Sequence, residues 1–429
     1  MLTTLVLLML LALLAIGTPV GLSLAIAGAT GLLVKGGLDM ALGVLQTAPF
    51  SAANSYELIT VPMFLLMAEF VILSGVADNL FKAGATWVGR VPGGLAMATA
   101  IAGAGFGAIS GSSTASAATL SSTTIPAMLK QNYEPKLACG VVAISGTLAM
   151  LIPPSIALVI YGIIADVSIG QLLVGGVIPG LVVTLTIIAT VYFLVWQDPS
   201  RAPLGRSYTW KEKIQSLSVV GPMLFLFFAV TGLIYTGVAT PTEASGIGAF
   251  GAFLLAIKEG KINFKTTLRA LNRASQTSCM IVLIILGAQI FGYFFTLTQS
   301  TQQLVAWVGA LDTSRWLIIA MILLGYLALG CIMDQVAILI LTIPVVLPLV
   351  TSLGFDPIWF GVIVIVTAEV GMVTPPVGLN VFVVARYTGR PLAEIFRGVM
   401  PHVIAHILVI ALLVIFPEII LWLPSTMKQ

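Results

Sequence analysis

The chain repeats its helix-breaking residues at a constant offset of 222 positions, without a gap. Thr18-Pro19 recurs as Thr240-Pro241, and Pro153-Pro154 recurs as Pro375-Pro376. The same offset relates Pro126 to Pro348, Glu134-Pro135 to Asp356-Pro357, and Gly176 and Pro179 to Gly398 and Pro401. Proline removes a backbone hydrogen bond and clashes with the preceding helical turn. The fold must therefore hold two copies of one pattern of interrupted apolar helices.

Composition places these helices in a membrane. The 429 residues are 59% hydrophobic and only 8% charged, whereas soluble domains carry about a quarter charged residues. The net charge is +3 and the basic residues are scattered, which argues against a nucleic-acid partner. The three cysteines lack disulfide or metal-ligand spacing, so we interpret them as packing residues. The chain is predicted to be an all-α polytopic membrane protein.

Each half of the chain is predicted to contain five spans and one re-entrant helical hairpin. The hairpins occupy about 92–130 and 315–351, which are apolar but too long for one helix. Double prolines break the fourth spans, about 138–164 and 358–385. The halves cover 1–210 and 211–429. The remaining spans are about 2–17, 19–34, 56–80 and 172–196 in the first half, and 218–238, 242–257, 276–298 and 400–423 in the second.

Charge predicts the orientation of the spans. Segments 198–213 and 258–273 are rich in Lys and Arg and are separated by two spans, so both are expected on the cytoplasmic side. Lys35 is the main exception to this scheme. Because five spans is an odd number, the second half is predicted to be inverted relative to the first, with both chain ends outside. Segments 79–91 and 258–273 are either interfacial arms that brace the hairpins or ordinary loops.

A hydroxyl-rich run marks the tip of the first hairpin. Ten of the fifteen residues from 110 to 124 are Ser or Thr, and Gly103, Gly105, Gly107 and Gly111 precede or enter the run. Hydroxyls and freed carbonyls suit a dehydrated alkali cation, and glycine lets other groups approach the backbone. Close packing of small residues between membrane helices is the alternative. Because the run lies at a predicted hairpin tip, and the other half has an equivalent tip, we favour an ion site.

The double prolines are expected to lie opposite these tips in both halves. Carbonyls freed at such a break can bind a cation, while the new helix N-terminus favours an anion. At the shared offset Asp334 matches Ser112 and Thr367 matches Ser145. Asp334 and Glu369 are acids in apolar sequence, and therefore candidates for function or for buried structural carboxylates. Asn380 either donates to a substrate oxygen or satisfies helix backbone.

Enzymatic chemistry finds little support in the sequence. His402 and His406 have i, i+4 spacing but no third metal ligand nearby, so no transition-metal site is predicted. We find no HExxH motif, no convincing nucleophile elbow and no phosphate-binding loop of the Walker type. Duplicated membrane halves with matching helix breaks instead favour a secondary transporter. A channel and a polytopic membrane enzyme remain less favoured alternatives.

Three motifs, in this order, resemble a known family: Gly-Ser-Ser-Thr-Ala-Ser at 111–116, Ile-Pro-Pro-Ser at 152–155 and Val-Thr-Pro-Pro-Val-Gly-Leu-Asn at 373–380. The chain resembles, over nearly its whole length, the large membrane subunit of TRAP (tripartite ATP-independent periplasmic) transporters. The resemblance implies an elevator-type fold, sodium as coupling ion, no other cofactor and no enzymatic activity. It also implies a periplasmic substrate-binding protein, a small four-span membrane subunit, and a carboxylate such as a C4-dicarboxylate or sialic acid as substrate. The implied location is the bacterial inner membrane.

The resemblance also implies binding residues. One sodium site would use Ser112, Ser113 and Thr114 with Gly146 and Pro153, and a second would use Gly330, Asp334, Thr367, Met372 and Thr374. Substrate would lie between the hairpin tips, near Ser113, Thr114, Pro154, Pro376 and Asn380. A stand-alone ion-coupled carboxylate carrier, needing no binding protein, is the alternative in the same functional class.

Overall fold

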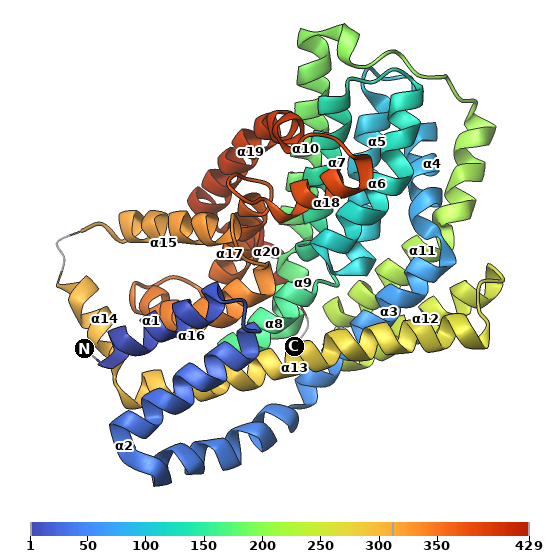
Figure 1. Cartoon of the computed structure of the whole chain (residues 1–429). Coiled ribbons are helices and arrows are strands. Elements are labelled where there is room, and N and C mark those ends of the chain that lie inside the picture. The colour runs from blue at the N-terminus through green and yellow to red at the C-terminus, as the bar shows by residue number, and fades with distance from the viewer. Residues whose placement is uncertain (1, 311–312, 428–429) are drawn as a thin grey trace.

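The computed structural model describes residues 2–310 and 313–427, and these residues form helices and no strand (Figure 1). The outermost residues of the two predicted halves, 1 and 428–429, lie outside this description, as do 311–312. The prediction of an all-helical membrane protein is confirmed. Seven helices in the described part are long and apolar enough to cross a bilayer.

The first half contains ten α-helices and three short 3-10 helices. Their order is α1 (Leu2–Ala15), α2 (Val20–Ala53), η1 (Tyr56–Ile59), α3 (Thr60–Ser74), α4 (Val76–Val88), α5 (Gly94–Ser110), α6 (Ser113–Lys130), α7 (Pro135–Thr147), η2 (Leu148–Met150), α8 (Ile156–Ala165), α9 (Ile169–Gly175), α10 (Val177–Gln197) and η3 (Pro199–Arg201).

The second half contains α11 (Trp210–Tyr235), α12 (Pro241–Lys258), α13 (Phe264–Leu297), α14 (Ser300–Gly309), α15 (Arg315–Gly330), α16 (Gln335–Ser352), α17 (Pro357–Gly371), α18 (Leu379–Thr388), α19 (Leu392–Ile415) and α20 (Glu418–Ser425). Helix bounds recur at the sequence offset: α6 and α16 begin at 113 and 335 and end at 130 and 352, a shift of 222 at both ends. Helices α7 and α17 both begin at the proline of the matched Glu134-Pro135 and Asp356-Pro357.

The first half departs from the predicted spans at two places. The expected span 19–34 continues as α2 to Ala53, with a kink at Gly37, whose φ of 76° is readily adopted by glycine. The expected span 56–80 ends at Gly75, whose φ of 73° separates α3 from α4. Helix α4 covers most of segment 79–91. The basic segment 258–273 does not form one arm, because Lys258 ends α12 and α13 begins at Phe264.

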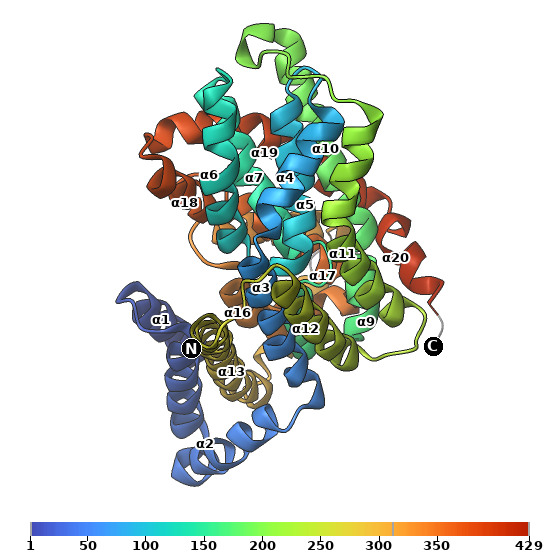
Figure 2. The same cartoon turned by 90° about the vertical axis from the view of Figure 1, so that its right-hand side faces the viewer.

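The helices pack in two groups (Figure 1, Figure 2). In one, α2 lies along α13 and α3 lies along α12, with α1 and α11 beside them. In the other, α7 packs against α5, α6 and α19, α18 packs against α6, and α17 packs against α15. Helix α4 contacts both α5 and α11, so it lies between the groups.

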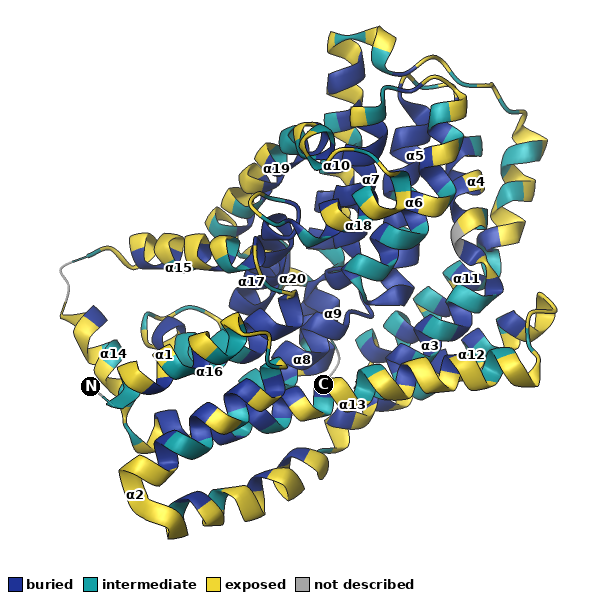
Figure 3. Ribbon diagram, in the orientation of Figure 1, coloured by how far each residue is buried: buried dark blue, intermediate teal, exposed yellow. Residues whose placement is uncertain are grey.

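The interrupted helices form the centre of the second group. Every residue from Leu137 to Leu158 is buried, as is every residue from Trp359 to Val373 (Figure 3). A helix that is apolar all round must be covered on every side, here by protein. By contrast, α2, α12 and α13 carry many exposed apolar residues, as expected for helices that face lipid.

Candidate functional site

The tip of the first hairpin is a tight turn between α5 and α6. Gly111 ends α5 in the left-handed region, with φ 57°, and Ser112 begins α6 as its N-cap. The Ser112 hydroxyl accepts a hydrogen bond from the Ala115 amide at 3.4 Å. Ser110 and Ser116 share a buried hydrogen bond of 2.6 Å between their hydroxyls across the turn. The hydroxyl-rich run therefore builds the turn itself, as well as supplying side chains to the site.

Glycine brings the backbone of α5 against the first interrupted helix. A Cβ on Gly103 would lie 2.8 Å from the Ser145 carbonyl oxygen, and one on Gly107 would lie 2.8 Å from the Ala149 amide nitrogen. Across the other helix of the hairpin, a Cβ on Gly146 would lie 3.0 Å from the Ala117 nitrogen. These approaches leave no room for a side chain at Gly103, Gly107 or Gly146. Both helices of the hairpin are thus held directly against α7 and η2.

The first helix break covers five residues between η2 and α8. Pro153 and Pro154 lie in it and are joined by a cis peptide bond. The Ser155 side chain organises its end, because it donates to the Met150 carbonyl and accepts from the Leu158 amide at 3.2 Å, capping α8. Both prolines are buried.

The second break, between α17 and α18, touches the tip of the second hairpin. The Gly378 amide donates to the Cys331 carbonyl at 3.2 Å, and the Asn380 amide donates to the Met372 carbonyl at 3.1 Å. A Cβ on Gly330 would lie 2.5 Å from the Ala368 carbonyl oxygen. The second tip is thus held against both ends of the second break.

The Asn380 side chain joins the two halves at this centre. The Asn380 side-chain amide donates to the Ser113 hydroxyl at 2.6 Å and to the Ala143 carbonyl at 3.4 Å. Asn380 and Ser113 are both fully buried, although they are 267 positions apart in the chain. The first residue of α6 therefore meets the start of α18.

The two halves differ in exposure. Pro375 and Pro376 are exposed, whereas their counterparts Pro153 and Pro154 are buried. Asp334 is also exposed, and its carboxylate accepts from the Val336 amide at 3.1 Å as the N-cap of α16. The structure places Asp334 as a helix cap, and in the described residues it has no ion-pair partner within 4 Å.

The other predicted ligands lie at the ends of the interrupted helices. The Thr367 hydroxyl donates to the Ile363 carbonyl at 2.8 Å, and the Thr374 hydroxyl donates to the Val370 carbonyl at 2.6 Å. Met372 is buried and Thr114 is half-buried. The hydroxyls of Thr367 and Thr374 donate these hydrogen bonds and keep lone pairs with which they can bind a ligand.

Four buried side-chain oxygens around the tips and breaks have no hydrogen-bond partner within the described part of the chain: Ser145 Oγ, Gln335 Oε1, Glu369 Oε1 and Asn380 Oδ1. Buried polar atoms in native proteins nearly always have partners, so these oxygens mark positions where a ligand or water is expected. Together with Thr367 and Thr374, they make the centre of the molecule rich in hard oxygen donors.

Gln335 is a site candidate that our sequence analysis missed. Its side-chain amide donates to the Ile365 carbonyl at 3.1 Å, and the residue is fully buried. Gln335 stands 222 positions after Ser113, so the repeat offset alone was a signal that could have found it. His402 and His406 are buried in α19, and no group of three His, Cys, Asp or Glu side chains in the described residues is arranged to hold a metal ion.

The sequence is similar to a known family and to known proteins. Residues 7–419 match the family described as the DctM component of the tripartite ATP-independent periplasmic transporter. The C4-dicarboxylate TRAP transporter large permease protein DctM of Pseudomonas aeruginosa is 32% identical over 400 residues, covering 91% of this chain and 93% of that protein. The sialic acid TRAP transporter large permease protein SiaM of Vibrio cholerae is 29% identical over 416 residues, covering 97% and 96%.

A solved structure has a similar fold. The YdaH transporter of Alcanivorax borkumensis superimposes with a TM-score of 0.65 over 90% of each chain, at 15% sequence identity. At this identity the likeness concerns the fold alone.

Proposed function

The chain belongs to the DctM family of TRAP transporter large membrane subunits, as its motifs predicted, and we propose that it imports an organic acid with sodium as coupling ion. It is a multi-pass membrane protein, and its relatives are transporter permeases rather than enzymes. We place it in the bacterial inner membrane, where a periplasmic binding protein would deliver substrate and a small four-span subunit would associate with it.

The observation that carries the proposal is the buried contact between Asn380 and Ser113. It joins the tip of one hairpin to the break of the other half's helix, which supports a single site to which both halves contribute. A substrate held between the tips would meet the N-terminus of α6 at Ser113 and Thr114, and Asn380 at the start of α18. Helix N-termini favour anions, because their free amides and dipole point outward. Pro154 and Pro376 would border this space from the two breaks.

The sodium ions would lie beside the substrate, one for each half. The first site would use Ser112, Ser113 and Thr114 with carbonyls of Gly146 and Pro153. The free hydroxyl of Ser145, adjacent to Gly146, supports this placement. Hydroxyl and carbonyl oxygens are the hard ligands that suit such a cation.

The second sodium site would use the tip at Gly330 and Asp334 with Thr367, Met372 and Thr374. Contacts between Gly330 and the end of α17 support it. Gln335 and Glu369, each with a buried free oxygen, extend the candidate ligands of this half.

Transport would follow an elevator mechanism. The group containing both hairpins and both broken helices would move against the group containing α2, α3, α12 and α13. The recurrence of helix bounds at 222 residues supports two repeats. The five spans predicted for each half, an odd number, would make the two repeats inverted.

The test is uptake of labelled carboxylates by proteoliposomes that contain the chain, with the small subunit and the binding protein added or omitted. We expect uptake only with all three components and an inward sodium gradient. Uptake that is unchanged when potassium replaces sodium would refute sodium coupling. Uptake without the binding protein would identify a stand-alone carrier, and currents far above carrier rates would identify a channel.

A further inference from the structure

Helices α10 and α19 leave an apolar groove of about 700 Å³ between them. On α10 the groove runs from Val182 to Leu194, and on α19 it runs from Pro401 to Leu412. Its walls include the exposed side chains Phe193, Ile404 and Leu408 and the small side chains Ala189 and Ala405. Within the described structure no other helix covers it.

The groove has the length of one leaflet. At 1.5 Å per residue, the lining stretch of each helix is about 17 Å long, roughly half of the 30 Å hydrocarbon thickness of a bilayer. A membrane-spanning helix from another protein would need a groove that extends across the full hydrocarbon thickness of the bilayer. The length therefore fits an acyl chain better than a spanning helix.

A basic pocket of about 350 Å³ continues the groove at one end. The two cavities share Leu194 and Pro401 in their walls. The pocket is lined by Lys136, Arg201 and Arg397, with Glu134 as the acid in its wall. An apolar groove that ends beside three cationic side chains matches an amphiphile with an anionic head group.

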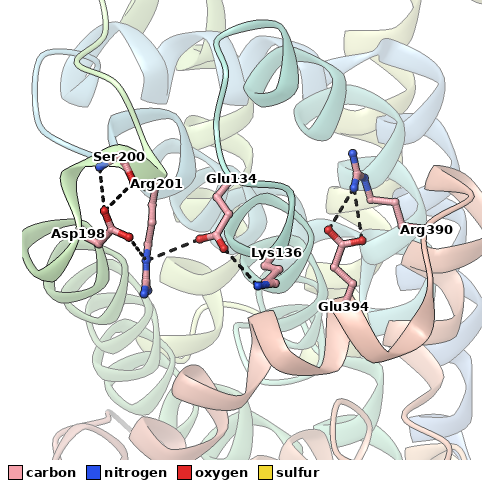
Figure 4. A network of polar contacts seen from close by, with 7 residues as sticks. All are labelled: Glu134, Lys136, Asp198, Ser200, Arg201, Arg390 and Glu394. Atoms are coloured by element: carbon pink, nitrogen blue, oxygen red, sulfur yellow. Dashed lines mark hydrogen bonds and ion pairs between the residues drawn. The ribbon is translucent and has the colours of Figure 1, made fainter.

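Glu134 in the pocket wall and Asp198 beside the pocket both form ion pairs with its cations (Figure 4). Glu134 lies 3.6 Å from Arg201 and 3.7 Å from Lys136, and its amide donates to the Arg201 carbonyl at 2.7 Å. Asp198 lies 3.4 Å from Arg201. Hydrogen bonds from Ser200, followed by the nearby Arg201, lower the pKa of the Asp198 carboxyl, so it stays ionised.

Arg397 is different from the other two cations. It is exposed and has no carboxylate within 4 Å among the residues that the structure describes, because Glu394 pairs with Arg390 at 3.1 Å instead. A positive charge therefore remains at the mouth of the groove after the internal ion pairs are counted.

Aromatic side chains place this end of the groove at the membrane surface. Tyr192, Phe193 and Trp196 are exposed in the last turns of α10, and the Phe193 and Trp196 rings are 6.2 Å apart. Tyr and Trp gather at the level of lipid headgroups. The basic pocket is lined by Leu194 and Gln197, on either side of Trp196, and therefore lies at the level of a lipid phosphate.

We propose that the α10–α19 groove binds one anionic glycerophospholipid, with an acyl chain along the groove and the phosphate at Arg397, Arg201 and Lys136. Basic pockets between membrane helices bind anionic headgroups in this way. On the predicted orientation, the lipid belongs to the cytoplasmic leaflet. This inference does not depend on the transported substrate or on sodium.

The experiment titrates the delipidated full-length protein with phosphatidylglycerol or phosphatidylcholine and counts bound lipid by native mass spectrometry. Arg397→Gln removes the unpaired cation, and Arg269→Gln, on an exposed part of α13, removes the same charge elsewhere. Ala405→Phe fills the groove, and Ala411→Phe adds the same bulk at an exposed position of α19 outside it. Binding is measured without transport, so its outcome is independent of the proposed function.

We expect one phosphatidylglycerol to bind in preference to phosphatidylcholine. Arg397→Gln should weaken its binding roughly fivefold, Ala405→Phe should abolish it, and the two control variants should bind like the parent. Equal binding by all variants, or equal binding of phosphatidylcholine, would overturn the proposal. Displacement by inorganic phosphate would also overturn it, because it would identify a soluble-anion pocket. A co-purified protein that occupies the groove in place of lipid would also overturn the proposal.

Discussion

The contact between Asn380 and Ser113 offers the sharpest test of the site. Asn380→Ala removes the donor of the 2.6 Å hydrogen bond to the Ser113 hydroxyl and of the 3.4 Å bond to the Ala143 carbonyl. Because Ser113 is fully buried, its hydroxyl loses this partner without gaining water. The first hairpin tip should then be held less firmly against α18.

The magnitude follows from the burial of the contact. Leaving a buried polar group without its partner costs about 1–3 kcal/mol. If the contact forms only when the site is closed around its ligands, that energy corresponds to a roughly 5- to 150-fold weaker apparent affinity. We therefore expect higher half-saturation concentrations for sodium and substrate in Asn380→Ala. Combining it with Ser113→Ala should cost less than the two single effects added, because both remove the same contact.

The assay is uptake into proteoliposomes across a sodium series, with thermal unfolding of each variant measured in detergent. Thr60→Ala is the matched control, because the Thr60 hydroxyl shares a buried 2.8 Å hydrogen bond with Thr242, joining α3 to α12. It should lower thermal stability and leave the sodium dependence unchanged. If Asn380→Ala shifts sodium dependence no more than Thr60→Ala does, the contact is structural and the reasoning about the site is wrong.

Three further changes test neighbouring parts of the site. Asp334→Asn should weaken the sodium dependence of uptake if the carboxylate acts on the ion, and an unaltered sodium response at normal expression would leave Asp334 as a helix cap. Pro153→Ala combined with Pro154→Ala should impair uptake, because restored helical hydrogen bonds would remove free carbonyls; full activity would contradict this. Gly330→Val should lower thermal stability by about 1–3 kcal/mol, because its Cβ would lie 2.5 Å from the Ala368 carbonyl oxygen, and an unchanged melting temperature would argue against this close packing.

Local chemistry made much of the fold readable from the sequence. The hairpins expected at about 92–130 and 315–351 correspond to α5–α6 and α15–α16. The double prolines do interrupt helices, but the repeated Pro126, Pro348 and Pro401 lie inside α6, α16 and α19, so the prediction that they break helices was wrong. The Gly36-Gly37 pair lies just beyond the expected span 19–34, but it only kinks α2, and the continuation of this helix to Ala53 was not foreseen.

Contacts between distant parts of the chain were harder to predict. Ser113 and Asn380 were each candidates, but their hydrogen bond depends on how two halves pack, which no local pattern encodes. The same limit applies to Asp334. Sequence shows an acid in apolar surroundings, whereas only the packed structure shows an exposed N-cap with an amide partner.

The most direct measurement is the thermal stability of the purified chain titrated with sodium chloride and, in parallel, with potassium chloride at equal ionic strength. A ligand that binds only the folded protein raises its melting temperature as concentration rises. We expect stabilisation by sodium alone, reduced in a Ser145→Ala variant that lacks the free hydroxyl beside Gly146. Equal melting curves in the two salts would contradict ion binding at the helix breaks.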